Sequence, residues 1–222
     1  MKKLLLAAIV LLIANLASVQ AQNKTSVDKS VVALLDTIYQ EDQKHRLQIA
    51  EILKKSRTDA DNIELVALLK IMNEKDSINL IKVEDILSKY GWLGADAIGD
   101  QGNKTLFLVI QHSNLKTQLK YLPMMQEAVS CGKIKKKDFA LLEDRIAVRQ
   151  GARQVYGSQI YKDYNTGESY VYPLVEPEKV NARRAEVGLE PIEDYLMQAV
   201  GIAWDVEKHK EQTKRLESQK EK

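Results

Sequence analysis

Apolar residues along much of the chain recur at the alternating spacing of three and four positions that marks one face of an α-helix. The stretch 29–56 carries the first long stripe of this kind. Its apolar members are Val31, Leu35, Ile38, Ile49 and Leu53. Where the stripe requires another apolar residue the chain has Asp42, with His45 and Arg46 on the same side. The pattern predicts a long amphipathic helix whose buried face is interrupted by charge.

Further helical patterns follow. A second helix is expected to begin near residue 61, with IELVALLKIM as its buried face, and a third at about 77–89 to end at Gly91. The segment GWLGADAIGDQGN is interpreted as an irregular loop. The run KTLFLVIQHSN, with Asn103 as N-cap, is compatible with a buried strand but favours a central helix. Two more helices are expected at 115–132, with a break or kink at Pro123, and at 136–151.

The pattern changes after Gly151. RQVYGSQIYKDY and ESYVYPLV are rich in aromatic and β-branched residues and flank an Asn-Thr-Gly turn, which predicts a β-hairpin near 153–175. In a regular strand here, Gln154, Tyr156 and Ser158 would share one face. Helical patterns then return. The predicted fold class is mainly α: a single multi-helix domain over 29–206 with one antiparallel β-hairpin inserted before the last helices. For the charged tail 207–222 we expect a solvated helix extension or disorder, without a role.

The amino-terminal pattern is typical of a signal peptide. Lys2 and Lys3 precede an apolar run that is too short to span a bilayer, and small residues follow. We expect a signal peptide at 1–21, cleavage after Ala21 and a polar leader at 22–28. The location predicted from this is periplasmic or secreted, with no membrane span after cleavage. An uncleaved anchor is the alternative.

The charge balance bears on the class of partner. The chain has 33 basic and 31 acidic residues, and loss of Lys2 and Lys3 with the signal peptide leaves 31 of each. A neutral chain has no overall attraction for nucleic acid, so nucleic acid is not expected as a partner. Cys131 is the only cysteine, which excludes an intramolecular disulfide, and we expect it to be a buried, inert thiol.

Several kinds of chemistry lack their sequence signals. The chain has no HExxH, no cysteine cluster and no Asp-rich calcium loop, so no metal site is predicted. It also lacks GxSxG, the P-loop and the dinucleotide-binding fingerprint, and no cofactor is expected. The partner stays open: a small polar ligand or a component of the cell envelope.

Six polar motifs remain, and their order carries a resemblance. They are DQKHR at 42–46, GW at 91–92, QHSN at 111–114, EDR at 143–145, QVYGSQ at 154–159 and ARRAEVGLEPIEDY at 182–195. The succession resembles a bacterial family known only as a domain of unknown function, whose members show DQxxR, GW or GWP, QHxD, DR, QxYGTQ and RRxxVGL. The chain departs from it at Asn114, Ser158 and Leu93, where the family more often has Asp, Thr and Pro. The resemblance implies one ordered domain from about Val31 to Tyr195 and brings no activity with it.

Two residues are the catalytic candidates. His112 is suited to act as a general base near neutral pH, the alternative being a core imidazole bonded to a backbone carbonyl. Asp144 is expected either to orient His112 or to pair with Arg46 or Arg153. Because Asp144 and Arg145 are adjacent on a helix, their side chains point about 100° apart and only one of them can face a given site.

The ligand-binding candidates come from the interrupted stripe, from the neighbours of the catalytic candidates and from the hairpin. They are Asp42, Arg46, Gln111, Arg145, Gln154, Tyr156 and Gln159. Asp42 and Arg46 have the spacing of a helix ion pair, so a structural pair is the alternative for them. The polar hairpin residues can line a ligand site or satisfy buried backbone groups equally well.

Three functions are compatible with these residues. One is a small extracytoplasmic hydrolase or lyase that uses acid–base chemistry around His112. Another is a non-catalytic binding module for a polar ligand or an envelope partner, since amides and arginines outnumber nucleophiles. The third is a structural domain in which the polar motifs form buried networks.

Overall fold

The computed structural model describes residues 27–54, 58–162 and 167–220. The predicted signal peptide and all of the polar leader before Val27 lie outside these residues. The described chain is mainly helical, with one two-stranded sheet before the last helices, which confirms the predicted fold class. Its elements in order are α2 (Lys29–Leu53), α3 (Asp59–Tyr90), α4 (Ala95–His112), α5 (Leu115–Ser130), α6 (Lys136–Arg149), β1 (Ile160–Lys162), β2 (Ser169–Val171), the 3-10 turn η1 (Pro177–Lys179), α7 (Val180–Val187), α8 (Ile192–Val200) and α9 (Val206–Lys220).

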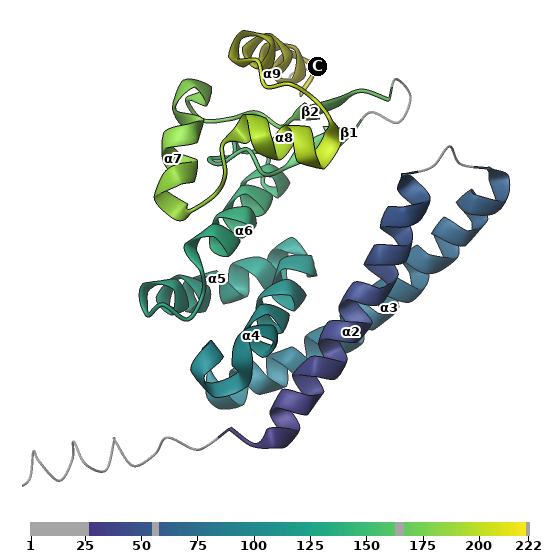
Figure 1. The fold of residues 1–222 in the computed structure, drawn as a ribbon, viewed down its shortest axis with the longest axis vertical. Helices are drawn as coiled ribbons and strands as arrows, with labels where there is room; N and C mark the ends of the chain where they lie inside the picture. Colours follow the sequence, from purple (N-terminus) through teal and green to yellow (C-terminus); the bar gives the residue numbers. More distant parts are fainter. Residues whose placement is uncertain (1–26, 55–57, 163–166, 221–222) are drawn as a thin grey trace, which may run out of the picture.

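Helices α2 and α3 pack side by side as a long arm that extends beyond the rest of the molecule (Figure 1). The carboxylate of Asp28 caps α2, and Thr58 and Asp61 form a capping box at the start of α3. The prediction of two separate helices here was wrong, because α3 is continuous from Asp59 to Tyr90. A helix needs an actual stop signal, and the polar residues between the two predicted segments supply none.

The prediction that IELVALLKIM forms a buried face was also wrong. Only Leu68 of this stretch is buried, in a small cluster with Ile49 and Ile52 near the outer end of the arm. Ile63 and Val66 are largely exposed. The outer part of the arm has α2 as its packing partner, so a single face of α3 suffices to fill that contact.

The predicted loop before the central helix is itself helical. Helix α4 begins at Ala95 and is kinked at Gly99, whose φ of 74° suits glycine. Asn103 therefore lies within the helix, where its amide donates to the carbonyl oxygen of Leu93, and it is not an N-cap. Helix α5 starts at Asn114, whose side chain accepts from the backbone N–H of Thr117, and continues through Pro123 to Ser130.

The main core lies where α2, the second half of α3, α4, α5 and α6 meet. Its fully buried members include Leu35, Ile38, Val83, Leu106, Ile110, Met125 and Leu142. A second core joins β2, α7 and α8 and comprises Val171, Leu174, Val180, Ile192 and Leu196. Helix α6 links the two halves, because it packs on α5 at one side and on α7 at the other (Figure 1).

The hairpin is present but shorter than predicted. Strands β1 and β2 pair antiparallel with Ile160 opposite Val171, and each strand has only three residues. Residues 153–159 form an irregular loop, with one isolated bridge from Gln154 to Leu174. Because no regular strand forms here, Gln154, Tyr156 and Ser158 do not share a strand face. Gly157, with φ of 74°, turns the backbone in the middle of this loop.

The described part of the charged tail forms helix α9, which packs on the second half. His209 and Thr213 are buried, Lys210 pairs with Glu178, and Arg153 pairs with Glu217.

Cys131, expected to be buried, is exposed at the end of α5. Among the described residues, no helix combines the length and the apolar content needed to cross a membrane.

Candidate functional site

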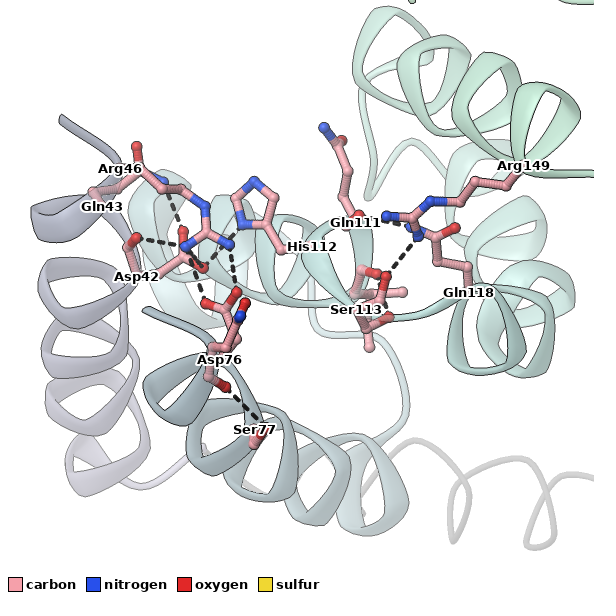
Figure 2. Close-up of polar contacts among 12 residues, drawn as sticks. Asp42, Gln43, Arg46, Asp76, Ser77, Gln111, His112, Ser113, Gln118 and Arg149 are labelled. Carbon is pink, nitrogen blue, oxygen red and sulfur yellow. Dashed lines mark hydrogen bonds and ion pairs between the residues drawn. The ribbon is translucent and has the colours of Figure 1, made fainter. Parts of the chain in front are cut away.

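The interrupted stripe of α2 meets the carboxy-terminal end of α4. The Oδ1 atom of Asp42 lies 2.9 Å from Nδ1 of His112, and only 2% of Asp42 is exposed. A carboxylate accepts from Nδ1–H, which leaves the lone pair of a neutral imidazole on Nε2. Figure 2 shows the Nε2 edge of the ring pointing away from Asp42, to the same side as the amide of Gln111. His112 thus has the orientation of a general base held by a buried acid.

Arg46 completes a polar cluster around this pair. Its guanidinium donates to both carboxylate oxygens of Asp76 at 3.0 and 2.7 Å, and to the backbone carbonyl of Asp42 at 2.9 Å (Figure 2). The amide of Gln43 donates to Oδ2 of Asp42 at 2.7 Å. Asp76 was not predicted, because an acid among the many charges of α3 carries no distinguishing pattern.

The carboxylate of Asp42 is held ionised. Burial raises its pKa, but the hydrogen bond and the charge of His112, the charge of Arg46 and the hydrogen bond from Gln43 together outweigh burial. The resulting pKa is lower than that of an ordinary aspartate. A group that stays negative in this place keeps the imidazole in one orientation.

Side chains from α5 and α6 gather at the end of α4. The amide nitrogen of Gln118 donates to the carbonyl oxygen of Gln111 at 2.7 Å, and Arg149 donates to the carbonyl oxygen of Ser113 at 2.7 Å (Figure 2). The side-chain oxygens of Gln111 and Gln118 are buried without a hydrogen-bond partner among the described residues. A buried amide oxygen left unpaired costs free energy, which a bound water or ligand atom would recover.

Arg145 lies on the same helix as Arg149. It precedes Arg149 by one helical turn, so both side chains leave the same face of α6, and Arg149 reaches Ser113 beside His112. The Nε of Arg145 is buried and has no hydrogen-bond partner within the described chain. Burial lowers the pKa of Arg145, and the positive charges of Arg149 and Arg46 lower it further. Of the charges within the described chain that shift this pKa, Arg149 and Arg46 lower it, only Tyr195 acts in the opposite direction, and none is a carboxylate.

Asp144 serves a different purpose from the one predicted. Its carboxylate accepts three backbone N–H groups, from Val155 at 2.7 Å, Tyr156 at 2.9 Å and Ser158 at 2.8 Å. It is fully buried and neither orients His112, which Asp42 does, nor pairs with Arg46 or Arg153. Asp144 holds the loop, whereas its neighbour Arg145 is acted on by the charges of Arg46 and Arg149.

Gln154 and Gln159 also belong to the loop. The fully buried amide of Gln154 donates to the carbonyl oxygens of Gln159 and Tyr172 and accepts from the N–H of Gln159. The amide nitrogen of Gln159 donates to Oγ of Ser158 at 3.0 Å. The polar side chains of this loop therefore satisfy backbone groups, which is the structural alternative weighed for them.

Three further loop carbonyls are satisfied from the carboxy-terminal helices. Arg183 donates to the carbonyl oxygen of Val155, the fully buried Arg184 to that of Tyr156, and the hydroxyl of Tyr195 to that of Ser158. Burial raises the pKa of Tyr156, and the negative charges of Glu143 and Asp144 add to this effect. A phenol with a raised pKa stays protonated, so Tyr156 is not poised to act as a base.

The predicted residues therefore do not meet in one place. Asp42, Arg46, Gln111 and His112 gather at the end of α4, where the charge of Arg46 also acts on Arg145, and we call these five residues the α4 site. Asp144, Gln154, Tyr156 and Gln159 build the loop. A cavity of about 420 Å³ lies elsewhere, between β2, Trp204 and α9. Within the described ranges, no three or more His, Cys, Asp or Glu side chains are grouped so as to hold a metal ion.

One known protein family has a model that covers most of this chain. The model of a family described as a family of unknown function, DUF6624, matches residues 26–205. The chain belongs to this family. No curated protein and no solved structure matches the chain. DUF6624 supplies no activity, so a function for the α4 site has to be argued from its chemistry.

One departure noted in the sequence now has a physical reading. At position 114 the chain has Asn114, where the family more often has Asp. In the structure it is the N-cap of α5, and its Oδ1 accepts from the N–H of Thr117 at 3.0 Å. Asn and Asp cap helices about equally well, so the exchange preserves this contact.

Proposed function

We propose that this DUF6624 protein is a small acid–base enzyme that acts outside the cytoplasm on a substrate carrying a carboxylate or phosphate group. The observation that carries the proposal is the 2.9 Å contact between buried Asp42 and Nδ1 of His112. The reaction class is a hydrolysis or an elimination, in which His112 removes a proton from water or from substrate. The signal-peptide pattern supports the location.

The chemistry follows from the tautomer. With Asp42 accepting from Nδ1–H, the lone pair on Nε2 is directed to the open side of the ring, and the negative charge of Asp42 stabilises the imidazolium that forms after proton transfer. Asp42 does not itself take up the proton, because its pKa is held below the ordinary range. It is a positioning residue, whereas His112 is the residue expected to touch the substrate.

Arg145 supplies the selectivity for an anion. A guanidinium that is half-buried, repelled by Arg46 and Arg149 and unpaired at Nε is destabilised until a negative group approaches it. A carboxylate or phosphate oxygen matches the geometry of its N–H donors. The unpaired amide oxygens of Gln111 and Gln118 would accept from hydroxyl or N–H groups of the same molecule.

A binding module for a polar anion is the second candidate. The buried, unpartnered amide oxygens of Gln111 and Gln118 favour it, because amides recognise ligands without taking part in proton transfer. Under this alternative His112 contributes to affinity only. Two results together would support the binding module. A His112 variant would still bind inorganic phosphate or succinate, and the unsubstituted protein would turn over none of the esters tested below.

The test is a comparison of ester hydrolysis by three variants. The purified protein is assayed with p-nitrophenyl hemisuccinate and p-nitrophenyl phosphate, and with uncharged p-nitrophenyl acetate as control. We expect His112→Gln to lower kcat by about 10²–10⁴-fold. Asp42→Asn should lower kcat less and change the pH profile, since it alters the environment of the imidazole. Arg145→Met should raise KM for the anionic esters and leave the acetate unaffected. Equal rates of ester hydrolysis for the unsubstituted protein and His112→Gln, with both proteins folded, would refute the proposal that His112 is a catalytic base.

A further inference from the structure

The outward face of α3 carries a stripe of exposed apolar side chains. Ile63 is 74% exposed and Ile81 69%, and Val66 and Ile78 are also exposed between them. On a helical projection Ile63 and Ile81 fall on the same line, with Val66 and Ile78 on either side of it. Buried Leu68, Val83 and Leu87 belong to the opposite, packed side of the same helix. The stripe is about 27 Å long at the usual rise per residue.

Two charges of opposite sign interrupt the stripe at its middle. Exposed Lys70 and Glu74 lie close to the line that joins Ile63 and Ile81. The arrangement is symmetric along the helix: Lys70 and Glu74 are equally far from residue 72, as are Val66 and Ile78, and Ile63 and Ile81. An unrelated partner would not require such symmetry.

We propose that this face is a homodimer interface, in which α3 packs antiparallel on α3 of a second copy about a twofold axis level with residue 72. This symmetry places Ile63 of each copy opposite Ile81 of the other, and Lys70 opposite Glu74. Lys70 and Glu74 thus form two ion pairs across the axis, one on each side of it. A parallel arrangement would bring like charges together instead. Across the interface, small Ala67 lies one residue from the level of Ile78, and small Ser77 one residue from the level of Val66, which gives the larger side chains room.

A membrane surface is a poorer match for this face. Helix α3 carries seven acidic side chains and four lysines, so an anionic bilayer would repel it. A second copy of the chain is the occupant for which the charges of the stripe are complementary.

The proposal is tested by charge exchange. The dimer fraction of the purified protein is measured by sedimentation equilibrium over a wide range of concentration. We expect a reversible monomer–dimer equilibrium. Lys70→Glu alone places two acids opposite each other at both crossing points, and Glu74→Lys alone places two lysines there. Each single variant should weaken dimerisation at least tenfold, and the double variant should restore it.

Apolar substitutions provide the matched control. Ile81→Glu should abolish the dimer. Leu47→Glu changes a residue of α2 that is 64% exposed and lies off the stripe, and it should leave the equilibrium unchanged. Circular dichroism of each variant establishes that the helices are retained. A protein that stays monomeric at every concentration overturns the proposal, as does an oligomer that Ile81→Glu and the single charge changes leave intact.

Discussion

Asp42 and His112 are 70 positions apart in the chain, and their side chains meet at 2.9 Å across the contact between α2 and α4. The pair explains why the apolar stripe of α2 is interrupted: the acid occupies a core position because an imidazole, an amide and a guanidinium satisfy it there. The α4 site is thus part of the packing between the two helices.

Removal of this acid should destabilise the fold. Asp42→Ala leaves His112 without its acceptor and deprives Arg46 of one of its two acids, so we expect a loss of about 3–5 kcal/mol in the free energy of unfolding. Asp42→Asn keeps the shape and should cost less. Urea unfolding followed by circular dichroism measures both. The matched control is exposed Asp85→Ala, expected to change stability by less than about 0.5 kcal/mol. Equal losses in the free energy of unfolding for Asp42→Ala and Asp85→Ala would contradict a stabilising role for the buried charge of Asp42.

Adjacent acids on α6 should respond in opposite ways to loss of charge. Asp144→Asn retains one acceptor oxygen for three N–H donors and brings a donor amide against the loop, so we expect a cost of about 2–4 kcal/mol. Burial raises the pKa of Glu143, and the charge of Asp144 raises it further. A raised carboxyl pKa means that ionised Glu143 opposes folding above that pKa. Glu143→Gln should therefore be neutral or stabilising at neutral pH. Thermal unfolding of the two variants at neutral pH decides this, and a stabilised Asp144→Asn would contradict the assigned contacts.

Gly157 should tolerate alanine worse than Gly151 does. Both have positive φ, 74° and 75°, so both substitutions carry a backbone cost of about 1–2 kcal/mol. A Cβ at Gly157 would lie 2.6 Å from Cδ1 of Ile192, whereas a Cβ at Gly151 meets nothing within 4 Å. We expect Gly157→Ala to cost about 1–3 kcal/mol more than Gly151→Ala. Because Val lacks Cδ1, this difference should shrink when Ile192 is Val, which a double-mutant cycle by urea unfolding measures. If the difference in stability between Gly157→Ala and Gly151→Ala stays the same with Val at position 192, the contact with Ile192 is not its cause.

Protonation of His209 should destabilise the second half. Burial, together with the charge of Arg153, lowers the pKa of His209 from 6.5 to about 4. The unfolded chain then binds a proton more readily than the folded chain, so stability is complete above about pH 6.5 and falls as the pH drops toward 4, by up to about 3 kcal/mol. His209→Gln should remove this loss between about pH 7 and pH 5, while His45→Gln should not. Fluorescence of Trp204, whose ring centre lies 5.1 Å from that of His209, reports the transition locally. An unchanged pH dependence in His209→Gln would rule out this residue as the source.

Local patterns predicted where helices form, but they did not predict which faces of those helices pack against other elements. The stripe of α2, the helix at KTLFLVIQHSN and the strands of the hairpin follow from periodicity and residue preference, which act over a few residues. The continuity of α3 depended on the absence of a stop signal, and the exposure of Ile63 depended on how little of the arm has a packing partner. Neither of these is encoded in hydrophobicity alone.

The same limit explains the partition of the polar motifs. Asp42, Arg46 and His112 were singled out because charge interrupted an apolar pattern, and they do come together. Asp144, Gln154 and Gln159 gave a similar signal, since a buried polar side chain looks alike in sequence whether it binds a ligand or a backbone N–H. The role of Asp76 depends on the crossing of two helices, which no local pattern reveals.

The pairing of Arg153 with Glu217 bears on the order in which the molecule is completed during synthesis. These residues are 64 positions apart, and α9, which also buries His209, lies beyond residues 26–205 matched by the family. Helices α2 to α6 precede the loop and α9 in the chain, so they can pack before the last residues have emerged. The loop and the hairpin reach their final surroundings only after α9 has emerged, so we expect the second half to stay exposed to proteases and chaperones for longer than the first.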